Sequence, residues 1–345
     1  MAKKQLGALL VTHPANWFYL TGFTGEAGAL VVHRGGATLI TDGRFTTQMR
    51  EETSSVRLVL QKGSLTDSTG QFLEANGLRR VGFDAVHTSV ALLSLLRKAA
   101  GTATKWISCS GLVETLRARK EPSELARMRQ AASLAGNVLA SVIKQLKPGV
   151  MENEIAAEIE YLMRRGGASG PAFETIVAFG GRSALPHARP TAKRLRKNEL
   201  VVLDLGAILA HYCSDITRTV YVGRAPARVK LWYRAVLEAQ IAAIAAVRAG
   251  VLCADVDAAA RQVLAGYKLD RLFTHSTGHG LGLEVHEDPR LARGQKARLE
   301  AGSVVTIEPG VYMAGVGGIR IEDDVALHPS NTEVLTRIPR DLIEL

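Results

Sequence analysis

The sequence has few cysteines and few aromatic residues, and it has no long apolar run. Only three cysteines occur among 345 residues, at Cys109, Cys213 and Cys253, and no two of them form a CxxC pair. This set excludes a disulfide framework and a thiolate metal site, and it favours a reducing cytoplasm. The first residues lack the apolar segment of a signal peptide. We therefore expect a cytoplasmic protein.

No segment is long and apolar enough to suggest a membrane span. The most apolar helical stretch covers residues 240–247 and is broken by Arg248 and Gly250, well below the roughly 20 residues that a bilayer requires. The formal net charge is +10, but the basic residues are spread along the chain. Their two modest clusters, 117–120 and 193–197, contain no aromatic residue, so we expect neither membrane nor nucleic acid as a partner.

A chain of 345 residues with 47% hydrophobic residues is long enough for two domains. In the first third, residues 6–12, 29–32, 38–41 and 81–84 read as strands, and residues 45–52 and 90–100 read as helices. This alternation predicts a small α/β domain over residues 1–118. A helix that starts near Pro122 and runs to Pro148 then opens a second domain over residues 119–345.

The second domain contains an internal repeat with an offset near 100 residues. Similar segments recur in the same order, each pair in a similar local context. The pairs are 147–150 with 248–251, 186–190 with 285–289, 201–206 with 304–310, and Asp215 with Glu322. Two similar halves packed about a pseudo-twofold axis would bring two carboxylates and one histidine from each half together.

The repeated carboxylates predict a pair of metal ions. Asp204 lies in an apolar run, where a charge is costly unless it is compensated. Asp215 follows after a turn, which places both on adjacent strands of a hairpin, and Glu308 and Glu322 repeat the arrangement. Four converging carboxylates would raise each other's pKa values, and divalent cations would compensate them. The oxygen-rich set suits Mn²⁺ or Co²⁺ and would also accept Zn²⁺. Two such ions can share a hydroxide and polarise a carbonyl, as in binuclear hydrolases.

Three of the nine histidines stand out from the rest. His279 lies between Gly278 and Gly280, which allow close backbone approach on both sides. His187 and His286 hold matching places in the repeat, and residues 283–286 alternate like a strand that ends at His286. We assign these three to function. Five of the other histidines are interpreted as surface or core residues: His13, His33, His87, His211 and His328.

These residues resemble the pita-bread metallopeptidase family, which contains aminopeptidase P, prolidase and methionine aminopeptidase. The resemblance lies in an Asp pair, then the segments 275–280 (HSTGHG), 308–310 (EPG) and 320–323 (RIED). Segments 19–25 (YLTGFTG) and 41–45 (TDGRF) resemble the N-terminal domain of the proline-directed members. The resemblance implies an α+β chain in which a smaller α/β creatinase-like domain precedes a pita-bread (creatinase/aminopeptidase) domain with an internal pseudo-twofold repeat.

The resemblance also implies a metal ligand set. Asp204 would chelate one ion, and Asp215 and Glu322 would bridge both ions. His279 and Glu308 would complete the second site, and Glu308 would also take the proton from a bridging water. All five ligand positions are intact in this sequence, which favours a working peptidase over a binding protein that has lost its metals.

Further residues receive roles around the substrate from the same resemblance. His187 and His286 would steady the peptide carbonyl and its tetrahedral intermediate, a task that suits neutral donors near pH 7. Arg320 would orient its neighbours by charge-assisted hydrogen bonding. His275 and Tyr312 would line the proline-side pocket or a proton relay.

The implied activity is the removal of one residue from small peptides whose second residue is proline. The chain would act as an Xaa-Pro aminopeptidase, as an Xaa-Pro dipeptidase or as both, and family resemblance suggests a homodimer. The choice depends on whether a loop blocks the far side of the cleft, and the sequence does not place that loop. One alternative is a methionine aminopeptidase, which usually lacks such an N-terminal domain. The other is a non-catalytic peptide- or nucleic-acid-binding module, against which the complete ligand set argues.

Overall fold

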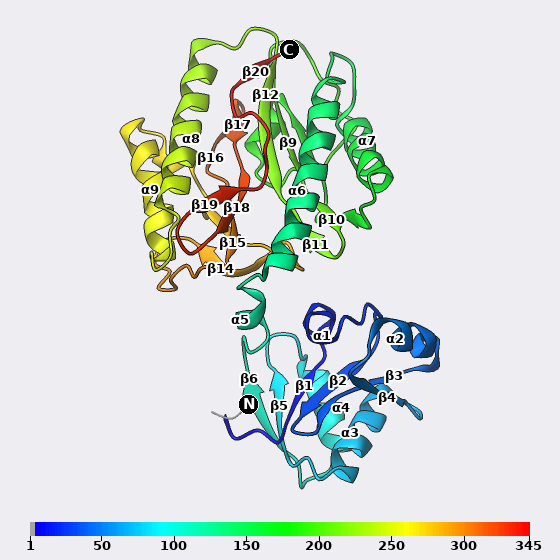
Figure 1. Cartoon of the computed structure of the whole chain (residues 1–345). Coiled ribbons are helices and arrows are strands. Elements are labelled where there is room, and N and C mark those ends of the chain that lie inside the picture. The colour runs from blue at the N-terminus through cyan, green and yellow to red at the C-terminus, as the bar shows by residue number, and fades with distance from the viewer. Residues whose placement is uncertain (1–3) are drawn as a thin grey trace. The chain divides into compact units, whose positions relative to one another are not determined.

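The computed structural model describes residues 4–345, and the chain divides into two compact units. The first ends at Arg117 and the second begins at Ala118. Figure 1 shows a mixed α/β unit in blue and cyan and a larger unit in green to red. Each unit has its own buried apolar clusters, so each is described by itself.

The first unit is built on a six-stranded mixed sheet in the order β4-β3-β2-β1-β5-β6. Side chains alternate across the sheet, so Leu9 and Val11 pack with Trp17 on one face while Leu10 packs with Leu73 on the other. The strands are β1 (Ala8–Val11), β2 (Ala29–His33), β3 (Gly36–Thr41), β4 (Val56–Leu60), β5 (Arg80–Asp84) and β6 (Lys105–Cys109). The helices are α1 (Pro14–Thr21), α2 (Thr46–Glu52), α3 (Leu65–Ala75), α4 (Val90–Ala99) and α5 (Glu114–Arg117).

Elements α1, α3, β4 and β6 were not predicted from the sequence. Helix α3 contains threonine, serine and glycine, which are weak helix formers. Its start is fixed by Ser64, whose hydroxyl accepts a hydrogen bond from the Asp67 amide at 3.0 Å. Packing of Phe72 and Leu73 into the core then holds the helix, so tertiary burial outweighs local propensity.

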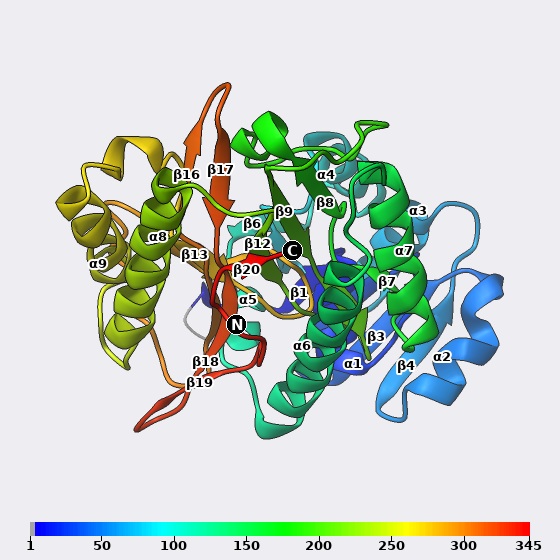
Figure 2. The ribbon, with the colours of Figure 1, turned by 90° about the horizontal axis from the view of Figure 1, so that it is seen from above.

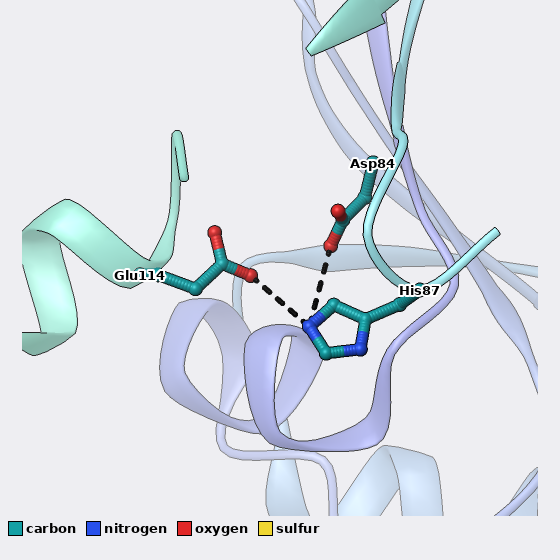
Figure 3. Close-up of side chains that lie close together, drawn as sticks. All are labelled: Asp84, His87 and Glu114. Atoms are coloured by element: carbon teal, nitrogen blue, oxygen red, sulfur yellow. Dashed lines mark ion pairs between the residues drawn. The ribbon is translucent and has the colours of Figure 1, made fainter. Parts of the chain in front are cut away.

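A polar cluster joins α1, the end of β5 and α5 (Figure 3). His87 Nε2 lies 3.9 Å from Asp84 Oδ2 and 3.6 Å from Glu114 Oε1. The Asn16 amide nitrogen donates to both carboxylates, and Arg117 Nη1 donates to Asn16 Oδ1 at 2.7 Å. The Asn16 amide therefore bridges the two carboxylates, and the Arg117 guanidinium holds the Asn16 side chain. These bonds connect α1, β5 and α5.

The second unit consists of two similar halves. In the first half, α6 (Pro122–Ile143), α7 (Glu152–Arg165) and β8 (Ile176–Phe179) lead to β9 (Glu199–Leu205), the short pair β10 (Ala207–Leu209) and β11 (Tyr212–Cys213), and β12 (Ile216–Val222). In the second half, α8 (Ala227–Ala246), α9 (Cys253–Gly266), β13 (Gly278–Gly280) and β14 (Glu287–Leu291) lead to β15 (Val304–Ile307), the hairpin β16 (Gly310–Met313) and β17 (Gly317–Arg320), and β18 (Asp323–Leu327). Outside this pattern lie β7 (Gly170–Pro171), β19 (Thr332–Val334) and β20 (Ile343–Glu344).

Matching contacts confirm the internal repeat. The Gly149 amide donates to Leu195 O and the Gly250 amide donates to Leu299 O, both at 2.9 Å. Both glycines have a positive φ, of 102° and 83°, which an L side chain rarely adopts. Arg298 Nη1 also donates to Gly250 O at 2.5 Å, as Arg194 Nη1 does to Gly149 O at 2.7 Å.

The helices of the two halves lie on opposite sides of the central strands. Figure 2 shows α6 and α7 on one side and α8 and α9 on the other, with β9, β12 and β18 between them. The strands form a sheet in the order β20-β12-β9-β8 and a second in the order β14-β13-β15-β18-β19. Apolar residues of α6 and α7 pack against β8, β9 and β12, and those of α8 and α9 pack against β15 and β18. This arrangement confirms the predicted α+β fold.

The three cysteines, Cys109, Cys213 and Cys253, are all buried, and none of them forms a disulfide. Within residues 4–345, no helix combines the length and the apolar character that crossing a bilayer would demand.

Helix α6 ends at Ile143, earlier than predicted, because the chain turns over Lys144 to Leu146 before Pro148.

Candidate metal centre

The four repeated carboxylates lie at equivalent ends of paired strands. Asp204 is the penultimate residue of β9, and Asp215 directly precedes β12, its antiparallel partner. Glu308 directly follows β15, and Glu322 directly precedes β18, which is the antiparallel partner of β15. In the first strand pair, Leu205 lies opposite Ile216. In the second, Ile307 lies opposite Asp323. The carboxylates therefore lie at the same end of each strand pair, although Asp204 lies within β9 while Glu308 lies just past β15.

Hydrogen bonds between the halves bring these strand ends together. The Glu322 amide donates to Thr217 O at 3.1 Å, and the Thr217 hydroxyl donates to Glu322 Oε2 at 2.6 Å. In the reverse direction, the Asp215 amide donates to Asp324 Oδ2 at 3.1 Å. Each half therefore orients a carboxylate of the other, or the backbone that carries it.

His279 completes the cluster from strand β13. Its Nε2 lies 3.8 Å from Asp215 Oδ2 and 3.6 Å from Glu308 Oε1. In the tautomer protonated at Nδ1, the ring donates to Gly280 O at 3.0 Å, which leaves the Nε2 lone pair facing the carboxylates. A Cβ at Gly278 would lie 1.8 Å from Thr306 O, so only glycine permits this approach of the strands. Ligand atoms of Asp215, His279 and Glu322 all lie within 4.8 Å of one another.

The electrostatics of the site disfavour its charged forms. Burial, followed by the neighbouring carboxylates, raises the pKa of Asp215 and of Glu322 well above the usual range. Burial also raises the pKa of Glu308 to about 8 and lowers the pKa of His279 to about 4. Without a cation, Glu308 therefore holds a proton at neutral pH while the His279 imidazole stays neutral.

The residues of this cluster fit a divalent metal. The Oδ1 atoms of Asp204, Asp215 and Asp324 are buried and have no hydrogen-bond partner. A buried acceptor without a donor is costly, and a cation compensates it. One imidazole nitrogen with several carboxylate oxygens is a donor set that first-row divalent ions accept. The cluster is therefore compatible with binding two divalent ions.

Arg320 links the cluster to two aromatic side chains. It is 3% exposed at the end of β17, and its Nη2 donates to Asp204 Oδ2. Its Nη1 donates to the Tyr312 hydroxyl at 2.7 Å, and His275 Nε2 lies 2.9 Å from the same hydroxyl oxygen. Burial, followed by Arg320, lowers the pKa of His275 to about 3, so this imidazole is neutral. Nδ1 of His275 is 3.8 Å from Glu308 Oε2.

The two remaining histidines lie in loops at this site. The His286 and His279 rings make an edge-to-face contact with centroids 4.4 Å apart. Burial, followed by the nearby His187, lowers the pKa of His286. His187 is exposed, and the carbonyl of the preceding Pro186 accepts from Arg320 Nη1 at 3.2 Å.

The predicted strand over residues 283–286 was wrong. These residues form bends, and β14 begins only at Glu287. The Glu287 side chain accounts for the difference, because its Oε1 accepts from the Glu284 amide at 3.2 Å and holds the segment in a turn. Alternation of side-chain polarity did not reveal this local bond.

Sequence reasoning missed several supporting residues. Asp257 is fully buried on α9 and accepts from the Thr277 amide at 3.2 Å and hydroxyl at 2.8 Å. Arg261, which pairs with Asp257, donates to His275 O at 2.6 Å. The i,i+4 spacing of Asp257 and Arg261 was a signal for the pair, although not for its target. Asp324, on strand β18, was visible only as part of an acidic run in an otherwise apolar segment.

The fold and the cluster define a class of hydrolases with carboxylate-rich metal centres. Residues 126–329 match the model of metallopeptidase family M24, and residues 1–119 match the creatinase/prolidase N-terminal domain. The chain belongs to metallopeptidase family M24, as the sequence resemblance predicted.

Individual relatives match over nearly their whole length. The Xaa-Pro dipeptidase of Pyrococcus horikoshii is 35% identical over 343 residues, which cover 99% of this chain and 96% of the relative. A solved Xaa-Pro dipeptidase from Bacillus anthracis has a TM-score of 0.96 at 36% identity, covering 100% of this chain and 96% of that one. The X-Pro aminopeptidase of Thermotoga maritima has a TM-score of 0.92 at 35% identity, covering 100% and 99%.

Proposed function

We propose that this protein is a metal-dependent exopeptidase that hydrolyses the bond between an N-terminal residue and a following proline. The observation that carries the proposal is the full-length similarity to an Xaa-Pro dipeptidase at 35% identity, together with the clustered carboxylates and histidine. The match to a creatinase/prolidase N-terminal domain argues against a methionine aminopeptidase, and the unpartnered carboxylate oxygens argue against a metal-free binding module.

The metal ligands in this proposal are Asp204, Asp215, His279, Glu308 and Glu322. Divalent ions, when bound, would supply an activated water and polarise the scissile carbonyl. Glu308 is placed to accept a proton at Oε2, because that oxygen faces His275 while Oε1 faces His279. The raised pKa of Glu308, about 8 before metal binds, reflects a site in which a carboxyl group holds a proton near neutral pH.

The other residues act on the substrate. His187 and His286 would donate hydrogen bonds to the carbonyl oxygen as it gains negative charge, and the His286 ring contacts the ring of the proposed ligand His279. Arg320 keeps Asp204 and Tyr312 in fixed positions through its guanidinium. Tyr312 and His275 would form the wall on the proline side.

The relatives support both subclasses of activity. Solved structures of an Xaa-Pro dipeptidase and of an X-Pro aminopeptidase both match the whole chain with TM-scores above 0.9. We propose that peptides and dipeptides with proline second are both candidate substrates. A homodimer in which the N-terminal domain (1–118) of one copy borders the cleft of the other would select between them, and sedimentation that shows a fully active monomer would contradict it.

The proposal is tested with chelator-stripped protein and three peptides. Ala-Pro, Ala-Pro-Ala and Met-Ala-Ser are incubated with and without Mn²⁺, Co²⁺ or Zn²⁺. Metal-dependent release from the proline peptides alone is the expected result, and the ratio of dipeptide to tripeptide cleavage assigns the subclass. Cleavage of Met-Ala-Ser alone would identify a methionine aminopeptidase, and no cleavage of any peptide would refute the proposal. We expect Mn²⁺ or Co²⁺ to support more turnover than Zn²⁺, because the centre is rich in oxygen ligands.

The proposed location is the cytoplasm. Its support is that the three cysteines are buried, form no disulfide and are spaced too irregularly for a disulfide framework. Fractionation of cells that express the tagged protein tests this, and recovery in an oxidising compartment would contradict it.

A further inference from the structure

A buried ion pair lies one residue away from His286. Lys120 Nζ is 3.0 Å from Glu287 Oε2, and the two side chains are only 1% and 6% exposed. Charged side chains are rarely buried this far unless they are paired, because leaving water is costly for each of them. A pair of this kind fixes the relative position of the two segments that carry it.

Both partners are held by further bonds. Lys120 lies between α5 and α6, and its amide donates to Gly302 O at 2.8 Å. Glu287 uses its second oxygen, Oε1, to accept from the Glu284 amide at 3.2 Å. A Cβ at Gly282 would lie only 2.7 Å from Glu287 Oε2, so the carboxylate packs directly on that glycine. The Glu287 carboxylate therefore contacts both Gly282 and Glu284, and it holds the bend of residues 282–286 in shape.

The same residue sets the position of His286 over the metal ligand. Glu287 is the first residue of β14 and pairs with Gly280 of β13, the neighbour of His279. The pairing brings the His286 and His279 rings to 4.4 Å between centroids. A shift of Glu287 would move His286 relative to the metal centre.

We propose that Lys120 and Glu287 are positioning residues, which hold His286 in place for the peptide carbonyl through their buried ion pair. This inference rests on the proposed peptidase function, because it assigns His286 to the reaction. Lys120 and Glu287 themselves do not touch the substrate. Their effect is to keep the segment 282–286 in one conformation, so that the imidazole is preorganised before the substrate arrives.

The inference is tested with Lys120→Met, Glu287→Gln, the double variant and Arg119→Met as a matched control. Arg119 is the adjacent residue and also forms an ion pair, with Glu300 at 3.6 Å, but both side chains are more than 60% exposed. Steady-state hydrolysis of Ala-Pro and Ala-Pro-Ala, metal content and amide hydrogen exchange of segment 282–287 are measured for each holoenzyme.

We expect Lys120→Met to lower kcat on the order of 10-fold to 100-fold, with little change in KM or metal content, because a misplaced group costs turnover of this size. Exchange in segment 282–287 should accelerate at least about 10-fold. The double variant should lose no more kcat than Lys120→Met alone, because both variants break the same ion pair. Arg119→Met should behave as wild type.

Wild-type kcat together with wild-type exchange in Lys120→Met would overturn the inference. A fall in kcat that matches a loss of metal would also overturn it, because it shows general damage to the site. Losses in the two single variants that add up in the double variant would overturn it as well, because they show that the two residues act independently. If the wild-type protein cleaves neither peptide, the proposed function fails, and the exchange measurement still decides whether the pair orders segment 282–287.

Discussion

Once its metals are removed, this protein should lose free energy of unfolding as the pH rises from 7 to 8. In the folded chain, burial and mutual repulsion raise the pKa values of Asp215, Glu308, Glu322 and Asp324, with that of Glu308 near 8. In the unfolded chain these carboxyls have pKa values near 4 and are ionised at pH 7. The folded state therefore retains protons that the unfolded state has released.

The sign and size of the effect follow from this difference. A carboxyl with a raised folded pKa contributes stability that is complete below its unfolded pKa and is lost as the pH rises through its folded pKa. The free energy of unfolding should fall by about 1.4 kcal/mol per pH unit for each retained proton, or about 2.8 for two. The neutral His275 and His279 have lowered pKa values and act with the opposite sign, but only near and below pH 6.5, where unfolded histidine is protonated.

Urea unfolding followed by circular dichroism, with excess chelator at several pH values between 7 and 8, measures this slope. The metal-loaded protein should show little slope, because cations replace the protons on the carboxylates. Glu322→Gln in chelator should show a smaller slope than wild type, since one titrating carboxyl is gone. A stability of the stripped wild-type protein that stays constant or rises over this range would refute the reasoning.

Three substitutions test other parts of the site. Asp215→Ala should abolish both metal binding and turnover, measured by elemental analysis and peptide hydrolysis, because in the proposed ligand set this residue would serve both ions; retained activity would break the proposed mechanism. His286→Ala should keep its metals but lose about 100-fold or more of kcat, as expected for a donor to the tetrahedral intermediate, and an unchanged kcat would remove His286 from the mechanism. Arg218→Met should lower the free energy of unfolding by about 3–5 kcal/mol, because it breaks the buried ion pair with Asp323 at 2.8 Å and removes the donor to four backbone carbonyls, although Arg340 still pairs with Asp323. A loss below about 1 kcal/mol by urea unfolding would show that the pair matters little.

The repeat made the metal centre predictable from the sequence. A single acidic residue in a strand carries little information, but Asp204 and Asp215 recur as Glu308 and Glu322 in the same order and in the same kind of segment. Pseudo-twofold packing then requires the matching residues to meet, and the ligand atoms of Asp215 and Glu322 do lie within 4.8 Å of each other. The fold class followed from the same repeat and from the α/β alternation that precedes it.

Contacts between segments distant in the sequence could not be predicted in this way. Asp257 supports the segment 275–279 from a helix about 20 residues earlier, and Lys120 meets Glu287 across 167 positions. No periodicity or motif relates such partners, because their pairing is set by how the helices and loops pack. The bend at residues 283–286 was mistaken for a strand for the same reason, since a side chain outside that segment determines its shape.

The most direct test of the whole account is the rate of Ala-Pro and Ala-Pro-Ala hydrolysis by stripped protein as Mn²⁺ is added in known equivalents. We predict no turnover without metal, a rise that levels off near two equivalents per chain, and no rise at all in Asp215→Ala. Turnover by the stripped protein that is indifferent to added metal, or full recovery by Asp215→Ala, would contradict a centre built from the repeated carboxylates.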